Sequence, residues 1–81
     1  MFKIAPHTHY ESFRTMLQVR RKAAGLTQAA LGKKLGWTQS IVAKIENGER
    51  RLDVVEYFIV ASAIGFDALE ALQEYQNSIE P

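Results

Sequence analysis

The residues whose side chains are best suited to specific binding chemistry lie in one short stretch between residues 39 and 47. Gln39 can form two hydrogen bonds with the edge of an adenine, and Lys44 can contact the edge of a guanine. Ala43 is small enough to let a helix approach the methyl group of a thymine. These side chains suit the recognition of nucleic-acid bases, provided that one element presents them together.

A helix over residues 38–47 would place these side chains on one face. Ile41 or Val42, together with Ile45, would face the core at helical spacing, and Thr38 is a suitable N-cap. The opposite side would present the polar and small residues of the stretch, which are Gln39, Ser40, Ala43, Lys44 and Asn47.

A second short helix is expected immediately before this one, over residues 27–35. Thr27 can cap its start and Gly36 can end it in a left-handed conformation. Two short helices joined by the turn at residues 35–37 are what a helix-turn-helix requires. In that motif the first helix lies across the DNA backbone and the second enters the major groove.

Helical periodicity extends over most of the remaining chain. It predicts a first helix over 10–24, a fourth over 52–63 and a fifth from residue 67 onward, while residues 1–9 lack a helical period and are expected to form an arm. No segment keeps the alternation of a strand. The expected fold is therefore all-α, a compact five-helix domain over residues 10–81.

Composition limits the classes of protein to be considered. With 81 residues, of which 47% are hydrophobic and 23% charged, the chain can form one globular domain. No apolar run is long enough for a membrane span or typical of a secretory signal, and the absence of cysteine excludes a disulfide framework. We expect a cytoplasmic protein.

Catalytic and metal chemistry find little support in the sequence. There is no cysteine nucleophile, no glycine-rich phosphate loop, and no pair of carboxylates with a histidine in a folded segment. His7 and His9 have the spacing of metal ligands, but a zinc site needs further ligands that do not accompany them. We expect neither an enzyme nor a metal or other cofactor.

The charges are unevenly distributed although the net charge is only +1. Residues 14–51 contain nine lysines and arginines but only two acidic residues, a net charge of +7, whereas residues 52–81 contain six acidic residues and no lysine or arginine. A basic segment suits an anionic partner such as nucleic acid. A surface that is dipolar without such a partner is the alternative on charge alone.

Three short segments of the chain, separated by characteristic numbers of residues, carry a resemblance to one known family. They are 25–31 (Gly-Leu-Thr-Gln-Ala-Ala-Leu), 35–40 (Leu-Gly-Trp-Thr-Gln-Ser) and 45–48 (Ile-Glu-Asn-Gly). In these segments the sequence resembles the helix-turn-helix of the lambda repressor, Cro and Xre family over roughly residues 13–69. The resemblance implies a lambda-repressor-like fold and a sequence-specific regulator of transcription that binds double-stranded DNA.

The resemblance also implies roles for individual residues. Gln39, Ser40 and Lys44 would face bases, and Ala43 completes the expected base-reading set. Gln28 would contact a phosphate and brace Gln39. Without the surrounding motif, these polar side chains would instead be read as solvated surface residues.

Other residues of the motif half are assigned to positioning and structure. Arg21 and Glu46 match a family pair that forms a buried salt bridge between the first and third helices. Each basic residue here could instead be an ordinary surface charge. Phosphate or positioning contacts are expected from Arg20, Thr27, Gln28, Thr38, Asn47, Arg50 and Arg51.

A homodimeric repressor is the leading functional hypothesis, because one small domain contacts few bases and two-fold pairing doubles the contacts. Residues 52–80 are the expected dimerisation region, since the fourth helix has a second apolar stripe beyond what one small core needs. The expected dimer contacts are Tyr57, Val60, Ile64, Phe66, Leu72 and Tyr75.

Two alternatives share the same DNA-binding chemistry. In one, the acidic C-terminal half binds another protein, as an antitoxin binds a toxin, and the chain also regulates its own operon. In the other, the chain is a controller protein of a restriction-modification system. The sequence does not choose among the homodimeric repressor, the antitoxin-type protein and the controller protein.

Overall fold

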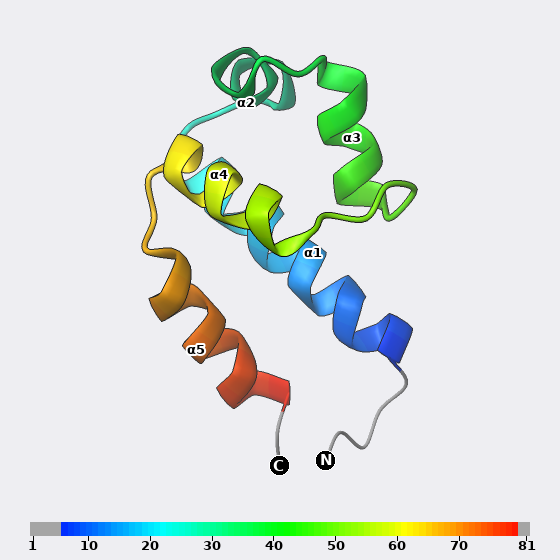
Figure 1. Ribbon diagram of the computed structural model, residues 1–81, viewed down its shortest axis with the longest axis vertical. Coiled ribbons are helices and arrows are strands. Elements are labelled where there is room, and N and C mark those ends of the chain that lie inside the picture. Colours follow the sequence, from blue (N-terminus) through cyan, green and yellow to red (C-terminus); the bar gives the residue numbers. More distant parts are fainter. Residues whose placement is uncertain (1–5, 80–81) are drawn as a thin grey trace.

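Five helices make up the computed structural model of the chain, which describes residues 6–79 (Figure 1). They are α1 (Pro6–Ala23), α2 (Gln28–Leu35), α3 (Gln39–Asn47), α4 (Val54–Ile64) and α5 (Ala68–Ile79). Within these residues all regular secondary structure is helical, so the expected all-α, five-helix fold is confirmed. None of the helices described combines the length and apolar character that a membrane crossing requires.

The first helix begins earlier than the sequence pattern predicts. Residues 6–9 belong to α1, so the expected arm over residues 1–9 is wrong for this part, while residues 1–5 lie outside the described residues. Pro6 occupies the first helical position, where a backbone N–H is not needed. His9 is buried, and its carbonyl accepts a hydrogen bond from the Tyr75 hydroxyl in α5.

The fourth helix shows how local sequence sets a boundary. The Asp53 carboxylate accepts a hydrogen bond from the Glu56 backbone N–H at 2.7 Å, and the Glu56 carboxylate accepts one from the Asp53 N–H at 3.1 Å. This reciprocal pair is a capping box, and it satisfies two donors at the helix start. The helix therefore begins after Asp53 rather than at Leu52.

The core lies where α1, α2, α3 and α4 meet. One cluster of buried apolar side chains lies there, which consists of Leu17, Leu31, Val42, Tyr57, Val60 and Ile64. The Tyr57 hydroxyl donates a hydrogen bond to the Ala68 carbonyl at 2.7 Å, so this buried polar group is satisfied and α4 is linked to the start of α5.

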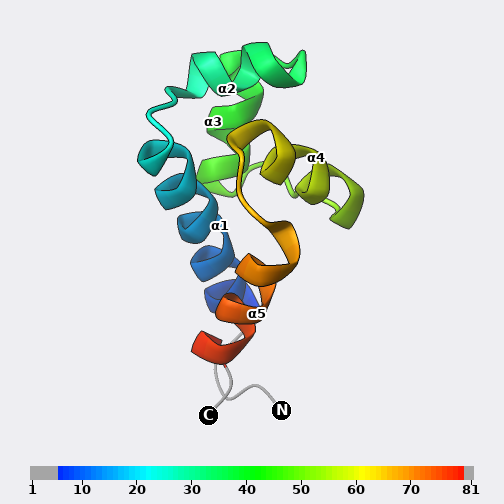
Figure 2. The same cartoon turned by 90° about the vertical axis from the view of Figure 1, so that its left-hand side faces the viewer.

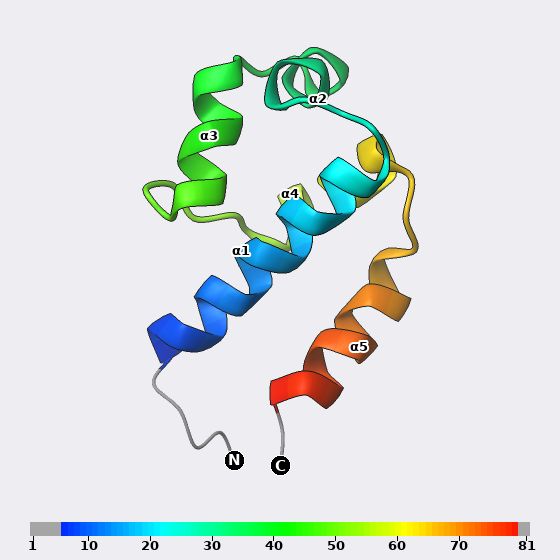
Figure 3. The same ribbon diagram turned by 180° about the vertical axis from the view of Figure 1, so that it is seen from behind.

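The helices are arranged along the longest dimension of the molecule, which measures 37 × 25 × 21 Å. α2 and α3 lie at one end, and the start of α1 lies near the end of α5 at the other (Figure 1). α1 and α5 run side by side in opposite directions, as the view from behind also shows (Figure 3). Figure 2 shows α4 on the side of the molecule opposite α1.

Candidate nucleic-acid interface

The helix-turn-helix is formed by α2 and α3, which residues 36–38 join. The Thr27 hydroxyl accepts a hydrogen bond from the Ala30 N–H at 3.0 Å, and the Thr38 hydroxyl accepts one from the Ile41 N–H at 3.2 Å. Both threonines therefore act as N-caps. Gly36 ends α2 with φ of 73°, a left-handed conformation that glycine adopts without strain.

Gly32 sets the close approach between α2 and the turn, and the sequence reasoning overlooked it. The Trp37 N–H donates to the Gly32 carbonyl at 2.8 Å. A Cβ atom on Gly32 would lie only 2.7 Å from the Trp37 carbonyl oxygen, a backbone atom with little freedom to move. The signal was present, because a glycine within a helical pattern often marks a close packing contact.

The outer face of α3 carries the residues expected to read bases. Val42 and Ile45 are buried on the inner side of the helix. Gln39, Ser40 and Lys44 are exposed, so these three side chains are presented together. Ala43 lies partly buried on the same helix and adds no bulk there.

A chain of hydrogen bonds connects the first turn of α3 to the interior. The Gln39 Nε2 donates to the Gln28 Oε1 at 2.7 Å, and the Gln28 Nε2 donates to the Glu46 Oε1 at 2.9 Å. Glu46 in turn accepts from Arg21, from Nε at 2.6 Å and from a terminal nitrogen at 3.0 Å. The Gln39 side chain is therefore held in place before any ligand binds.

Arg21 and Glu46 form the buried ion pair that the resemblance implies for them. Each side chain is only 7% exposed, and Arg21 also donates to the Leu26 carbonyl at 2.7 Å. Burial alone would raise the pKa of Glu46, but hydrogen bonds from Arg21 and Gln28 and the charge of Arg21 outweigh it. The pKa of Glu46 is therefore below its ordinary value, and the carboxylate stays ionised.

Two further residues of α1 hold α3, and the sequence reasoning missed both. The Gln18 Nε2 donates to the Glu46 carboxylate at 3.3 Å, and a terminal nitrogen of Arg14 donates to the Glu46 carbonyl at 2.9 Å. Arg14, Gln18 and Arg21 follow one another at spacings of four and three residues, which places them on one side of α1. A polar stripe at helical spacing was the signal in the sequence.

Comparisons with known proteins agree with this geometry. Residues 17–70 match the helix-turn-helix family HTH_3. A solved structure, an XRE-family like protein from Pseudomonas syringae pv. tomato str. DC3000, is 38% identical in sequence, with a TM-score of 0.87 over 91% of this chain and 90% of that chain. The chain belongs to the XRE-like helix-turn-helix family. Comparison with curated proteins gives no match.

Membership of the XRE-like family confirms the resemblance found in the sequence. The protein is a DNA-binding regulator of transcription, and its family indicates a non-enzymatic role with double-stranded DNA as the partner. The match over residues 17–70 covers α2, α3 and α4 completely and the C-terminal part of α1, so it includes every residue of the hydrogen-bond chain from Arg21 to Gln39.

The arginines of this XRE-like protein differ in their surroundings. Arg20 pairs with Glu74 of α5 at 2.8 Å and lies over the Phe66 ring, so the structure directs it toward α5 and away from the helix-turn-helix. A phosphate contact by Arg20 would have to compete with this ion pair, and it stays a prediction. The pairing partner lies 54 positions away, which local sequence does not reveal.

The loop after α3 contains two more arginines that were expected to contact phosphates. Arg50 is bonded to Glu56 at 2.7 Å and lies over the Trp37 ring, 5.2 Å from its centre. Arg51 is exposed and lies 4.3 Å from the centre of the Tyr10 ring. Of the two, Arg51 has no acidic partner among the ion pairs of residues 6–79, so its charge is the more available.

Asn47 at the end of α3 is also engaged locally. Its amide nitrogen donates to the Glu49 carboxylate at 3.1 Å, and its amide oxygen accepts from the Glu49 N–H at 3.0 Å. Asn47 therefore shapes the turn after α3, and its side chain is exposed.

The expected dimer contacts on α4 are wrong in their central residues. Tyr57, Val60 and Ile64 are 2%, 4% and 9% exposed, because this side of α4 packs into the core of the monomer. Of the remaining three, Phe66 and Leu72 pack against the same core, and Tyr75 contacts the ring of Phe13 and is bonded to the His9 carbonyl. The sequence correctly indicated two apolar sides of α4, but it assigned the wrong one to the core.

Proposed function

We propose that this protein is a homodimeric repressor that binds a two-fold symmetric operator through α3. Each copy would place α3 in the major groove with its N-terminal residues toward the bases. Occupation of an operator near a promoter would exclude RNA polymerase, and no cofactor would be needed. Two recognition helices about 34 Å apart match one turn of B-DNA and thus two half-sites.

Base contacts are assigned to the exposed side chains of α3. Gln39 suits adenine, Lys44 suits the edge of a guanine, and Ser40 can donate or accept at either. Ala43 would lie against a thymine methyl group. This assignment gives a preference for particular base pairs in each half-site.

Phosphate and positioning contacts are assigned to residues that flank these side chains. Gln28 and Thr27 lie at the start of α2, Thr38 caps α3, and Asn47 and Arg51 lie at or beyond its end. Contacts of this type fix the position of a protein on the duplex without selecting a sequence.

The hydrogen bond between Gln39 and Gln28 is the observation that carries the proposal. An exposed glutamine normally samples several side-chain conformations, and ordering it on binding costs free energy. Here the 2.7 Å bond, backed by Glu46 and Arg21, holds the Gln39 amide at the N-terminal end of the exposed face. A side chain ordered in advance is suited to bidentate contact with one base.

Two alanine variants test the assignment. An operator is first selected from random duplex oligonucleotides by the wild-type protein. We expect Gln39→Ala to lose about 1–3 kcal/mol on this operator, far less on a scrambled duplex, and to relax the preference at one or two base pairs. A uniform loss on both duplexes would mean that α3 is not the reading helix.

Arg51→Ala is the matched control. Because Arg51 lies beyond the end of α3, we expect its loss to weaken binding to both duplexes about equally and to reduce the salt slope by about two, one for each copy of the dimer. A loss restricted to the selected operator would remove Arg51 from the phosphate-contacting set.

A further inference from the structure

The outer face of α4 is apolar, and in the described part of the chain, residues 6–79, it is largely exposed. Val54 and Val55 are 64% and 65% exposed, and Phe58 and Ile59 are 43% and 49% exposed. These four large side chains are close together on one short helix. A grouped apolar surface of this kind marks an interaction site more often than scattered single residues do.

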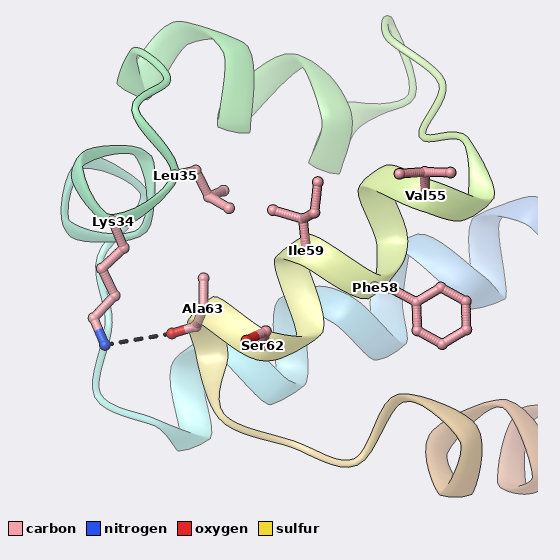
Figure 4. A pocket seen from close by; sticks show the side chains of 7 residues that line it. All are labelled: Lys34, Leu35, Val55, Phe58, Ile59, Ser62 and Ala63. Atoms are coloured by element: carbon pink, nitrogen blue, oxygen red, sulfur yellow. Dashed lines mark hydrogen bonds between the residues drawn. The ribbon is translucent and has the colours of Figure 1, made fainter.

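A groove of about 540 Å³ accompanies these side chains. Lys34 and Leu35 at the end of α2 form one wall, and the outer side of α4 from Val55 to Ala63 forms the other. Figure 4 shows Lys34 at one end of the groove and Phe58 at the other, with Leu35 between α2 and α4. The Lys34 ammonium donates to the Ala63 carbonyl at 3.3 Å, at the C-terminal end of α4.

We propose that a second copy of this chain occupies this groove, with the two α4 helices packed in opposite directions around a two-fold axis. The inference rests on the homodimer of the proposed function and assigns its interface. It replaces the buried stripe that the sequence suggested with the outer face of the same helix, whose apolar residues are exposed within residues 6–79.

Charge complementarity favours a second copy. Lys34 lies at the C-terminal end of α4, and the exposed Asp53 lies at its N-terminal end. Antiparallel pairing brings the Lys34 of each copy toward the Asp53 of the other. The only charged residue within α4 is Glu56, which is already bonded to Arg50, so the paired helices do not oppose unmatched like charges.

The surface also has the shape that a two-fold interface requires. In such an interface the same patch is used by both copies, so a projection and a hollow must occur side by side. Phe58 lies at one end of the groove, and Leu35 and Ile59 line it farther along α4 (Figure 4). Each copy can thus insert side chains into the groove of the other.

The place of α4 in the molecule agrees with the spacing of two half-sites. α2 and α3 lie at one end of the 37 Å axis and the end of α5 lies at the other (Figure 1). Pairing through that far end would separate the recognition helices by well over the spacing of about 34 Å that one turn of DNA requires. Pairing through α4 joins the copies across the short dimensions of 25 and 21 Å instead.

Disulfide trapping gives a direct test, because the natural sequence contains no cysteine. The variant Phe58→Cys places a thiol on the proposed surface, and Leu69→Cys, at a site 67% exposed on α5, is the matched control. Under mild oxidation with and without the selected operator, we expect a covalent dimer from Phe58→Cys only. Equal cross-linking of the two variants would overturn the inference.

Charge substitution gives a second, independent readout. Ile59→Asp would set two carboxylates against each other across the axis, and we expect sedimentation to show dimerisation weakened by about 100-fold or more. Leu69→Asp should dimerise like the wild type. Circular dichroism checks that both variants remain folded, which the half-exposed position of Ile59 favours.

The outcomes separate the interface from the proposed function. If Ile59→Asp dimerises like the wild type, the interface is wrong while operator binding stands on its own test. If the wild type stays monomeric even on the operator, both the interface and the homodimer are wrong, and a different protein is the partner of this face. If the wild type dimerises through α4 but binds no DNA selectively, the interface stands and the proposed repressor fails.

Discussion

Glu46 accepts hydrogen bonds from three side chains that belong to two other helices. Gln18 and Arg21 reach it from α1, and Gln28 reaches it from α2. A buried carboxylate is costly unless it is both paired and hydrogen-bonded, and this one is. The same group thus fixes the angle of α3 and, through Gln28, the side chain that is proposed to read a base.

Arg21→Ala is expected to unfold the protein more easily rather than to change its sequence preference. Removal of one partner leaves the other charge buried, which costs about 3–5 kcal/mol. Arg20→Ala is the matched control, since the Arg20–Glu74 pair is solvent-exposed and should contribute about 0–1 kcal/mol. Urea denaturation compares the two. Equal losses in both variants would show that the Arg21 pair is not the one that stabilises the fold.

The lowered pKa of Glu46 predicts a defined loss of stability in acid. A carboxylate whose pKa is lower in the folded than in the unfolded state stabilises the fold above the unfolded value, which is ordinarily 4.5. This stabilisation is lost as the pH falls below about 4.5 and through the folded value. Glu46→Gln should therefore melt at a temperature that depends less on pH in this range than that of the wild type.

A control for the acid prediction is Glu56→Gln. The hydrogen bond from Arg50 is the main cause that lowers the pKa of Glu56, so this group contributes in the same direction. Each single variant should remove only part of the acid sensitivity. An unchanged pH profile for Glu46→Gln would contradict the role given to Glu46.

At the scale of elements, the turn between α2 and α3 depends on Gly32, which has no side chain. Alanine is ordinarily favoured over glycine within a helix by about 1 kcal/mol. At Gly32, however, the new Cβ would meet the Trp37 carbonyl at 2.7 Å. We expect Gly32→Ala to destabilise the fold by about 1–3 kcal/mol, the usual cost of overpacking.

The reverse substitution elsewhere in α2 provides the comparison. Ala29 is exposed, so Ala29→Gly should cost up to about 1 kcal/mol from helix propensity alone. Thermal melting of both variants shows whether each substitution stabilises or destabilises the fold. A stabilised Gly32→Ala protein would mean that α2 and the turn can separate without loss.

The threonine caps of α2 and α3 and the glycine that ends α2 were predictable from the sequence, because these residues act within a few residues of where they stand. Which side of α4 faces the core was not predictable. Nearly every residue from Val54 to Ile64 is apolar, so the period that normally separates an inner from an outer side is missing. Contacts with residues far away in the chain, such as that between the rings of Tyr57 and Phe13 of α1, select Tyr57 and Val60 for the core.

The exposed face of α3 was predicted better than the contacts that support it, for the same reason. Gln39 and Lys44 follow from the period of one short helix. The positions of Arg14 and Gln18 depend on how α1 crosses α3, and that of Arg20 depends on Glu74 of α5. Such contacts join residues far apart in the sequence, which periodicity does not relate.

At the scale of the whole molecule, the lysines of α2 and α3 are separated in space from the acidic residues of α5. Lys33, Lys34 and Lys44 belong to α2 and α3, whereas the acidic residues of α5 lie toward the opposite end of the long axis (Figure 1). The basic end can approach a duplex while the acidic end is held away from the phosphates.

This separation predicts a steep dependence of DNA binding on salt. If a dimer makes about six to ten phosphate contacts, raising the salt from 50 to 200 mM should weaken binding by about 10³ to 10⁵. Fluorescence anisotropy with a labelled operator measures the slope. A flat response would contradict binding through the basic end.

The position of Trp37 makes the helix-turn-helix observable without any label. It is the only tryptophan in the sequence, it precedes the cap of α3, and the guanidinium of Arg50 lies over its ring. Indole emission responds to the polarity and the charge around the ring. The intrinsic fluorescence of the protein therefore reports on this one turn, and it offers an optical signal for following both the unfolding of α2 and α3 and the approach of a duplex to them.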